Sequence, residues 1–209
     1  MQRVLGYDPL EVGLALLPAT IAMGTMSLKV SDRVNMRFGP KAVLIPALGA
    51  LAAALLLMAR TPVEASFAAD LLAPMTLMGI GAGLAFPALM TLAMSGVEME
   101  DSGLASGLVN TSVQVGGAIG LAVLATLATE RTDSLTADGE STLAALNGGY
   151  HLAYLIGVAL IGIAIAVAFV FLKSPDMSAM MAAHGEGDAD GEQHELERAQ
   201  AEAALSEAA

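Results

Sequence analysis

The chain has 209 residues, of which 56% are hydrophobic and only 14% are charged, and its mean hydropathy of +0.67 excludes an ordinary soluble domain. The formal net charge of −12 gives no reason to expect a nucleic-acid partner, and it describes a tail, because the acidic residues are concentrated after Asp176. The chain contains no cysteine, which excludes disulfides and thiolate metal sites.

Five apolar segments are each close to the roughly 20 residues that a helix needs to cross a hydrocarbon layer. The first follows Asp8-Pro9, which is typical of a helix start because aspartate caps free N–H groups and proline lacks one. No signal peptide precedes it, so this run is expected to direct its own insertion. The predicted fold is an all-α, polytopic membrane helix bundle over residues 1–175, with spans at about residues 10–30, 42–59, 71–97, 104–129 and 150–172.

Four of the nine basic residues lie in the thirteen residues from Lys29 to Lys41, which we expect to form a tight loop ending at Gly39-Pro40. The positive-inside rule makes this loop cytoplasmic and so predicts an outside N-terminus and an inside C-terminus. Six basic residues are then inside and three outside: Lys29, Arg33, Arg37, Lys41, Lys173 and Arg198 against Arg3, Arg60 and Arg131.

The third segment contains Gly79, Gly81 and Gly83, which would let a neighbouring helix approach closely. Its GxGxG pattern is not a nucleotide-binding loop, because it lies within an apolar run with no strand before it. Helix packing is therefore the predicted role of Gly79 and Gly83.

The fourth segment has no charged residue between Leu104 and Thr129, yet one side of the predicted helix is small and polar. At about 100° per residue, this side carries Asn110, Gln114 and three glycines. Lipid cannot satisfy an amide, so this side is expected to face other helices or a watery cavity. Two interpretations remain open: a packing surface alone, or a surface at which Asn110 or Gln114 also contacts a transported solute. The packing glycines predicted here are Gly103, Gly107, Gly116, Gly117 and Gly120.

A polar outer loop is predicted from Glu130 to Gly149, with a turn at Asp138-Gly139. Residues 176–209 are predicted to be a disordered, acidic cytoplasmic tail with a marginal helix over 193–204. His184 and His194 in this tail match no tight metal site, and His151 is interpreted as an interfacial residue. No metal, cofactor or enzyme chemistry is predicted, because no nucleophile, base and orienting acid converge.

Three stretches resemble the major facilitator superfamily, specifically the C-terminal half of its fourteen-span drug:proton antiporter branch. GYDPLEVGLALLP (residues 6–18) is similar to that branch's entry into its tenth span, whereas residues 79–97 and 102–123 are similar to its twelfth and thirteenth spans. The resemblance covers residues 1 to about 175.

The basic loop also resembles the family's motif, glycine-x-x-x-aspartate-arginine-x-glycine-x-arginine/lysine, with departures. If Arg37, Gly39 and Lys41 are matched to it, Met36 occupies the aspartate position; if Asp32 and Arg33 are matched instead, the glycine comes several residues late. The loop is therefore interpreted as a topology signal, with the charge relay of family members as the alternative.

The resemblance implies a transporter in the plasma membrane that exports small, often amphipathic compounds, driven by proton influx. Family members have two six-helix bundles that rock about a central site. This chain has five spans of one bundle, so the resemblance implies a missing N-terminal bundle, from the same gene or a second chain, as a partner beside the lipid bilayer. The alternative is a non-transporting fragment or gene remnant that only packs with partner helices. The cavity-lining candidates are Asn110, Gln114, Ser106 and Thr111, followed by Thr20 and Thr91.

Overall fold

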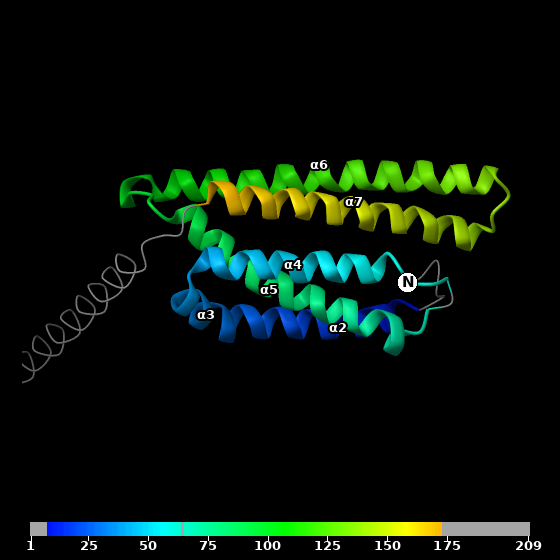
Figure 1. The fold of residues 1–209 in the computed structure, drawn as a ribbon, viewed down its shortest axis with the longest axis horizontal. Coiled ribbons are helices and arrows are strands. Elements are labelled where there is room, and N and C mark those ends of the chain that lie inside the picture. Colours follow the sequence, from blue (N-terminus) through cyan, green and yellow to red (C-terminus); the bar gives the residue numbers. More distant parts are fainter. Residues whose placement is uncertain (1–7, 64, 173–209) are drawn as a thin grey trace, which may run out of the picture. The chain divides into compact units, whose positions relative to one another are not determined.

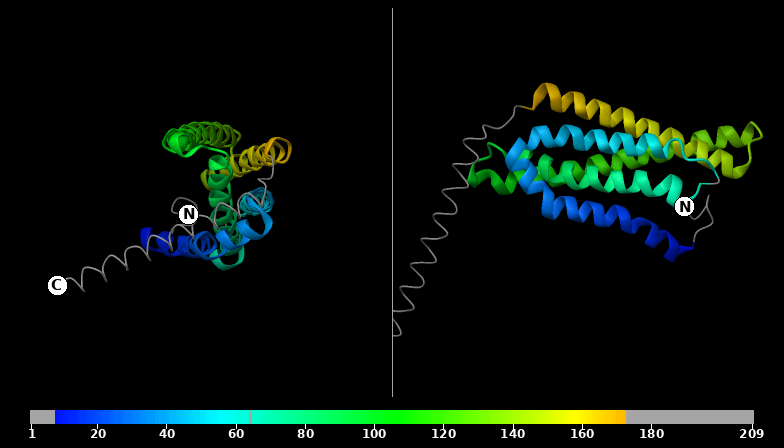
Figure 2. Two further views of the ribbon diagram at one scale, coloured as in Figure 1. Left: turned by 90° about the vertical axis from the view of Figure 1, so that its left-hand side faces the viewer. Right: turned by 60° about the horizontal axis from the view of Figure 1, so that its bottom comes forward.

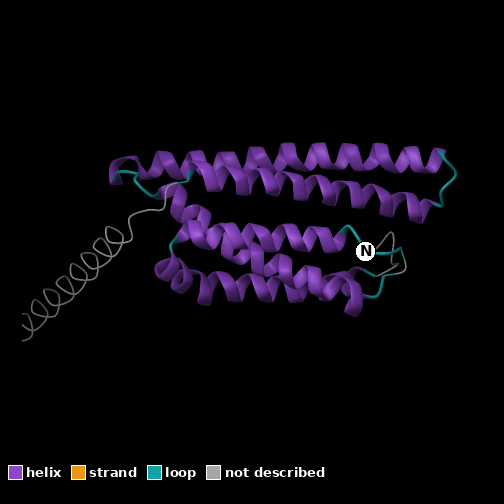
Figure 3. Ribbon diagram, viewed as in Figure 1, coloured by secondary structure: helices purple, strands orange, loops and turns teal. Residues whose placement is uncertain are grey.

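The computed structural model describes residues 8–63 and 65–172, and every regular element in this part of the chain is a helix (Figures 1 and 3). Five of the helical segments are long and apolar enough to cross a membrane, which confirms the predicted all-α bundle. In chain order the elements are α2 (Pro9–Thr25), η1 (Met26–Val30), α3 (Ser31–Phe38), α4 (Pro40–Met58), η2 (Phe67–Leu71), α5 (Leu72–Met94), η3 (Met99–Asp101), α6 (Ser102–Ala137) and α7 (Thr142–Phe171).

Helix α2 begins where Asp8-Pro9 predicts it. The Asp8 carboxylate accepts a hydrogen bond from the backbone N–H of Glu11 at 2.8 Å, and the Glu11 carboxylate accepts one from the N–H of Asp8 at 3.0 Å. This reciprocal capping box satisfies two N–H groups that have no partner within the helix.

The prediction of a tight basic loop from Lys29 to Lys41 is wrong, because the chain stays helical through η1 and α3 as far as Phe38. One side of α3 is buried, and there the Asn35 amide donates to the Ser31 hydroxyl at 3.1 Å. The basic side chains of Arg33 and Arg37 remain exposed on the other side, so an amphipathic helix accommodates them. The break comes at Gly39, whose φ of 83° is readily adopted only by glycine.

The polar outer loop predicted from Glu130 to Gly149 is also wrong. Helix α6 continues to Ala137 and α7 already begins at Thr142, capped by the Ser141 hydroxyl, so only a short turn at 138–141 remains. The predicted turn at Asp138-Gly139 is confirmed, with Gly139 at φ 91°. At 1.5 Å per residue the 36 residues of α6 extend about 54 Å, well beyond a ~30 Å hydrocarbon layer, so its polar end requires no loop.

Helix α5 packs against α2 and α4, while α7 packs against α4 and α6 (Figure 2). The buried core lies where α4, α5 and α7 meet, and its members are small or branched apolar residues: Val43, Leu44, Ala47, Ala85, Ala88, Leu92 and Ala168. By contrast, no residue of α6 is buried within the described part of the chain. The surface of α6 that does not contact α7 is therefore available to other groups.

Several predictions lie outside the described residues. These are the polar lead before Asp8, the acidic tail over 176–209 with its marginal helix, and the two tail histidines, His184 and His194.

Candidate functional site

The polar side chains predicted to line a cavity are exposed along the first half of α6. Ser106, Asn110, Thr111 and Gln114 are all exposed, and they share this half of the helix with Gly103 and Gly107. Asn110 donates through Nδ2 to the carbonyl oxygen of Ser106 at 3.1 Å, and the Thr111 hydroxyl donates to that of Gly107 at 2.8 Å. These bonds stay within α6, so the amide oxygen of Asn110 remains available to a further donor.

The structure separates the predicted packing glycines into two groups. A Cβ atom added to Gly83 would lie 2.6 Å from the carbonyl oxygen of Met23, and one on Gly79 would meet the carbonyl oxygen of Ala19 even more closely. These two glycines therefore lie directly against α2. The α6 glycines have no atom of another element within 4 Å of an added Cβ, and their packing role stays a prediction: Gly103, Gly107, Gly116, Gly117 and Gly120.

The two remaining candidates belong to other helices. Thr20 is exposed on α2, where its hydroxyl donates to the carbonyl oxygen of Leu16 at 3.1 Å. Thr91 is half-buried on α5 and donates to the carbonyl oxygen of Pro87 at 2.9 Å. Both hydroxyls are thus satisfied within their own helix, and a shared site with Asn110 or Gln114 stays a prediction.

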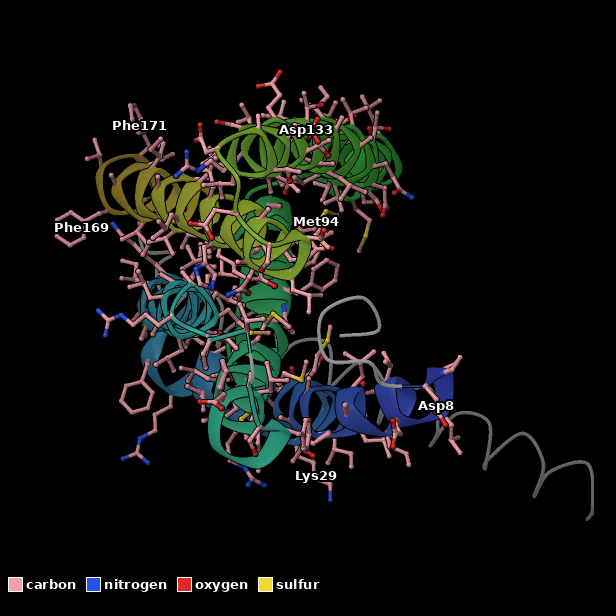
Figure 4. All side chains as sticks on the ribbon, turned by 90° about the vertical axis from the view of Figure 1, so that its right-hand side faces the viewer. Asp8, Lys29, Met94, Asp133, Phe169 and Phe171 are labelled. Atoms are coloured by element: carbon pink, nitrogen blue, oxygen red, sulfur yellow. The ribbon has the colours of Figure 1, made fainter. Side chains whose placement is uncertain are left out.

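The basic motif candidates lie around the α3–α4 junction. Asp32 and Arg33 are exposed on α3, and the Arg37 guanidinium lies 5.4 Å from the centroid of the Phe38 ring. Lys41 instead turns toward α7, where its ammonium donates to the carbonyl oxygens of Phe169 and Leu172. Figure 4 shows the Phe169 and Phe171 side chains projecting outward from α7.

A second feature, which the sequence did not predict, is an apolar cavity of about 550 Å³ between four helices. Its volume lies within the range of small-molecule sites, but it lacks the few convergent polar groups that orient a ligand in such sites. None of the six polar candidates lines this cavity. Its lining residues belong to α2, α4, α5 and α7 or follow α7 directly: Met23, Leu44, Leu48, Leu51, Ala82, Ala85, Phe86, Leu89, Ala164, Val167, Ala168, Phe171 and Leu172.

The sequence predicts His151 only as an interfacial residue, and it does not predict that Asn147 and His151 connect α7 to the chain just after α4. Asn147 donates through Nδ2 to the carbonyl oxygen of Thr61 at 3.0 Å, and His151 Nε2 lies 2.9 Å from the same oxygen. Their spacing of four residues places both on one side of α7. This spacing could have indicated a shared contact, but the prediction of a loop up to Gly149 excluded Asn147 from the helix.

Comparison of the amino-acid sequence with known proteins identifies its family. The model of the Major Facilitator Superfamily matches residues 1–189. The chain is 31% identical over 180 residues to the puromycin resistance protein pur8 of Streptomyces alboniger, an alignment that covers 83% of this chain and 36% of that protein. It is 38% identical over 173 residues to the cephamycin export protein CmcT of Amycolatopsis lactamdurans, covering 80% of this chain and 33% of that protein.

A third relative is the multidrug resistance protein Stp of Mycobacterium tuberculosis, 33% identical over 124 residues, which cover 59% of this chain and 22% of that protein. The chain spans about a third of the length of the first two relatives. The family model extends over most of the chain and includes all five long helices, which makes this a multi-pass membrane protein. The chain belongs to the major facilitator superfamily.

Proposed function

We propose that this chain is part of a plasma-membrane exporter of small amphipathic compounds, driven by proton influx. Support comes from the family and from the printed names of relatives, which refer to puromycin resistance, cephamycin export and multidrug resistance. The transported compound is not specified further, since those names describe the relatives. Because the chain spans about a third of the first two relatives, the proposed activity is that of a larger assembly.

The observation that carries the proposal is the exposed polar side of α6. An amide in the hydrocarbon layer needs a protein or water partner, because lipid chains offer it no hydrogen bond. Asn110 and Gln114 are both exposed in a stretch without charged residues. We assign this side of α6 to the water-filled solute pathway, with Ser106 and Thr111 beside it.

The proposed assembly includes further helices, in the same polypeptide or in a second chain. None of Asp, Glu, Lys, Arg or His lies near the middle of a predicted span, where a proton-transfer residue would be expected. The residues that couple export to protons therefore belong to those further helices in this proposal. The chain itself contributes the solute-facing side of α6 and the bundle that supports it.

Export of a fluorescent cation tests this assignment. The chain is expressed in a drug-sensitive bacterium, together with any coding sequence that adjoins it in frame, and ethidium efflux is measured with and without a protonophore. We expect proton-dependent efflux that falls about tenfold in the double variant Asn110→Ala and Gln114→Ala, the loss expected for about two hydrogen bonds.

Ser112→Ala is the matched control for the double variant. Ser112 is also exposed on α6 and also donates to the carbonyl oxygen four residues earlier, that of Leu108, at 2.8 Å. It lies on the other side of the helix from Asn110. Unchanged efflux in the double variant would make the polar side a packing surface only. Absence of efflux in every variant, with the protein in the membrane, would favour a non-transporting helix partner.

A further inference from the structure

The N-terminal end of α4 and the C-terminal end of α7 are joined by a cation. Lys41, in the first turn of α4, donates through Nζ to the carbonyl oxygen of Phe169 at 3.1 Å and to that of Leu172. The same ammonium lies 5.6 Å from the centroid of the Phe169 ring. Carbonyls in the last turn of a helix have no partner within that helix and carry partial negative charge. Lys41 therefore caps the C-terminus of α7 from a different helix.

The other ends of the same two helices are joined by amide and imidazole groups. Thr61 follows the end of α4, and its N–H is itself bonded to the carbonyl oxygen of Met58 at 3.2 Å. Its carbonyl oxygen accepts from Asn147 and lies within hydrogen-bond distance of His151. Asn147 and His151 both belong to the first three turns of α7, whereas Phe169 and Leu172 lie at its C-terminal end, so the two contacts are at opposite ends of the helix.

Apolar contacts fill the space between these two polar junctions. Ala168 on α7 is buried in the core cluster with Val43 and Leu44 of α4. Further along, the absence of a side chain at Gly157 admits Leu55, whose Cδ1 would lie 2.9 Å from an added Cβ. The α4–α7 pair is thus in contact along its length and bonded at both ends.

The contact between α6 and α7 is of a different kind. The hydroxyls of Thr129, Thr132 and Thr136 on α6 donate to carbonyl oxygens of α6 itself, four residues earlier in each case. Close approach to α7 occurs at Gly149, where an added Cβ would lie 2.5 Å from the carbonyl oxygen of Ala128. Steric fit therefore joins these two helices where they approach most closely.

We propose that Lys41 at one end, and Asn147 with His151 at the other, are positioning residues that fasten α4 and α7 into one unit, whereas α6 meets α7 by steric fit without such polar bonds in the described part of the chain. In a moving transporter such a unit would keep its shape as other helices shift. The inference concerns the restraint between two helices and does not depend on the proposed export activity.

Hydrogen exchange measured by mass spectrometry, on the full 209-residue chain in lipid nanodiscs, tests each junction from the opposite helix. In Lys41→Met we expect the amides of residues 169–172, at the C-terminal end of α7 and just after it, to exchange about tenfold faster, the loss expected for one hydrogen bond from a charged donor. Lys41→Arg keeps the charge and the donors, so it should preserve the protection. Equal exchange in these two variants would overturn the proposed junction at Lys41.

The junction of Asn147 and His151 with Thr61 is tested in the same way. Asn147→Ala combined with His151→Phe should increase exchange of the amides of Arg60 and Thr61 at the end of α4 by a similar factor. His151→Gln with Asn147 intact retains an N–H donor and should leave that exchange unchanged. A change confined to the α7 amides near position 147 would show a local role only and would overturn the proposed link to α4.

Spin-label distances test whether the pair behaves as one unit. The chain has no cysteine, so labels can be placed at the exposed positions Leu57 and Val170, on α4 and α7, or at Leu121 on α6 and Val170. We expect a narrower distance distribution for the α4–α7 labels than for the α6–α7 labels. Loss of both junctions should remove this difference. Equal widths of the two distance distributions in the unaltered chain would overturn this proposal. Such a result would leave the proposed export activity, which ethidium efflux tests, unaffected.

Discussion

Single glycines on α5 decide how closely its neighbours approach. Gly79 and Gly83 are four residues apart and lie on the side that meets α2, whereas Gly81 lies against Ala47 and Leu51 of α4. In a bilayer no hydrophobic force draws apolar helices together, so their association depends on close van der Waals packing. These glycines therefore let the backbone of α5 approach its two neighbours closely enough for such packing.

Adding one methyl group at this contact should be costly. Gly83→Ala places a Cβ 2.6 Å from a backbone oxygen of α2, which cannot rotate away as a side chain would. We expect a loss of about 1–3 kcal/mol in the free energy of unfolding, as for other overpacked sites. Thermal unfolding in detergent measures it. Gly49→Ala on α4 is the control, since nothing lies within 4 Å of its added Cβ; equal destabilisation by both changes would contradict the packing role.

At the scale of elements, α6 and α7 form an antiparallel hairpin with a very short turn. The turn leaves α6 long, with a polar end on which Arg131 and Asp133 are exposed. Gly148 and Gly149 of α7 permit the closest approach to α6 just inside this turn. The hairpin is thus closed at its turn, and the polar residues of α6 lie toward its other end.

Substitution at the closed end should separate the two helices. Gly149→Ala brings a Cβ to 2.5 Å from the carbonyl oxygen of Ala128, so we expect the turn at 138–141 to become more accessible. Faster cleavage after Glu140 by a glutamyl endopeptidase would report this opening. Gly162→Ala, on the same helix but with open space around its added Cβ, should leave the cleavage rate unchanged. Equal rates in both variants would contradict steric closure.

At the scale of the whole molecule, the basic residues predict which face of the membrane each connection occupies. Lys29, Arg33, Arg37 and Lys41 all lie near the α3–α4 junction, which the positive-inside rule assigns to the cytoplasm. The end of α5 and the start of α6 would then also be cytoplasmic, and the turn between α6 and α7 would be external. Asp8 at the start of α2 would lie on the same external side as that turn.

Cysteine labelling checks this orientation, because the chain has no cysteine of its own. Met99→Cys introduces a thiol at a position that is 90% exposed, and Ser141→Cys introduces one in the exposed α6–α7 turn. In intact cells we expect a membrane-impermeant maleimide to label position 141, whereas position 99 should react only after lysis. The opposite pattern would invert the predicted topology.

The sequence predicts correctly those features that depend on the solubility of each segment in lipid. Lipid requires about twenty consecutive apolar residues, so the existence of five long helices could be inferred from composition. Prediction from the sequence failed at helix ends, where polar residues from Lys29 to Phe38 and from Glu130 to Ala137 were assigned to loops. Outside the hydrocarbon layer a polar segment can be a helix or a loop, and capping and packing decide between them.

For the candidate site, the sequence identified the polar side of α6, but it did not identify which groups the polar residues of other helices contact. Asn110 and Gln114 could be assigned to one side of a helix from the 100° repeat alone. Lys41 was interpreted as a topology signal, whereas its bonds reach carbonyls 128 and 131 residues later in the chain. No local pattern encodes a partner at that separation.

Local sequence is enough to establish an all-helical membrane protein with an uncharged, amide-bearing fourth span, because the insolubility of charge and amides in lipid is a property of each segment alone. The three-dimensional arrangement was needed to show which glycines contact a neighbour, where the hairpin of α6 and α7 closes, and that α4 and α7 are bonded at both ends. Those features depend on which helix surfaces meet, and that is settled by packing between segments far apart in the chain.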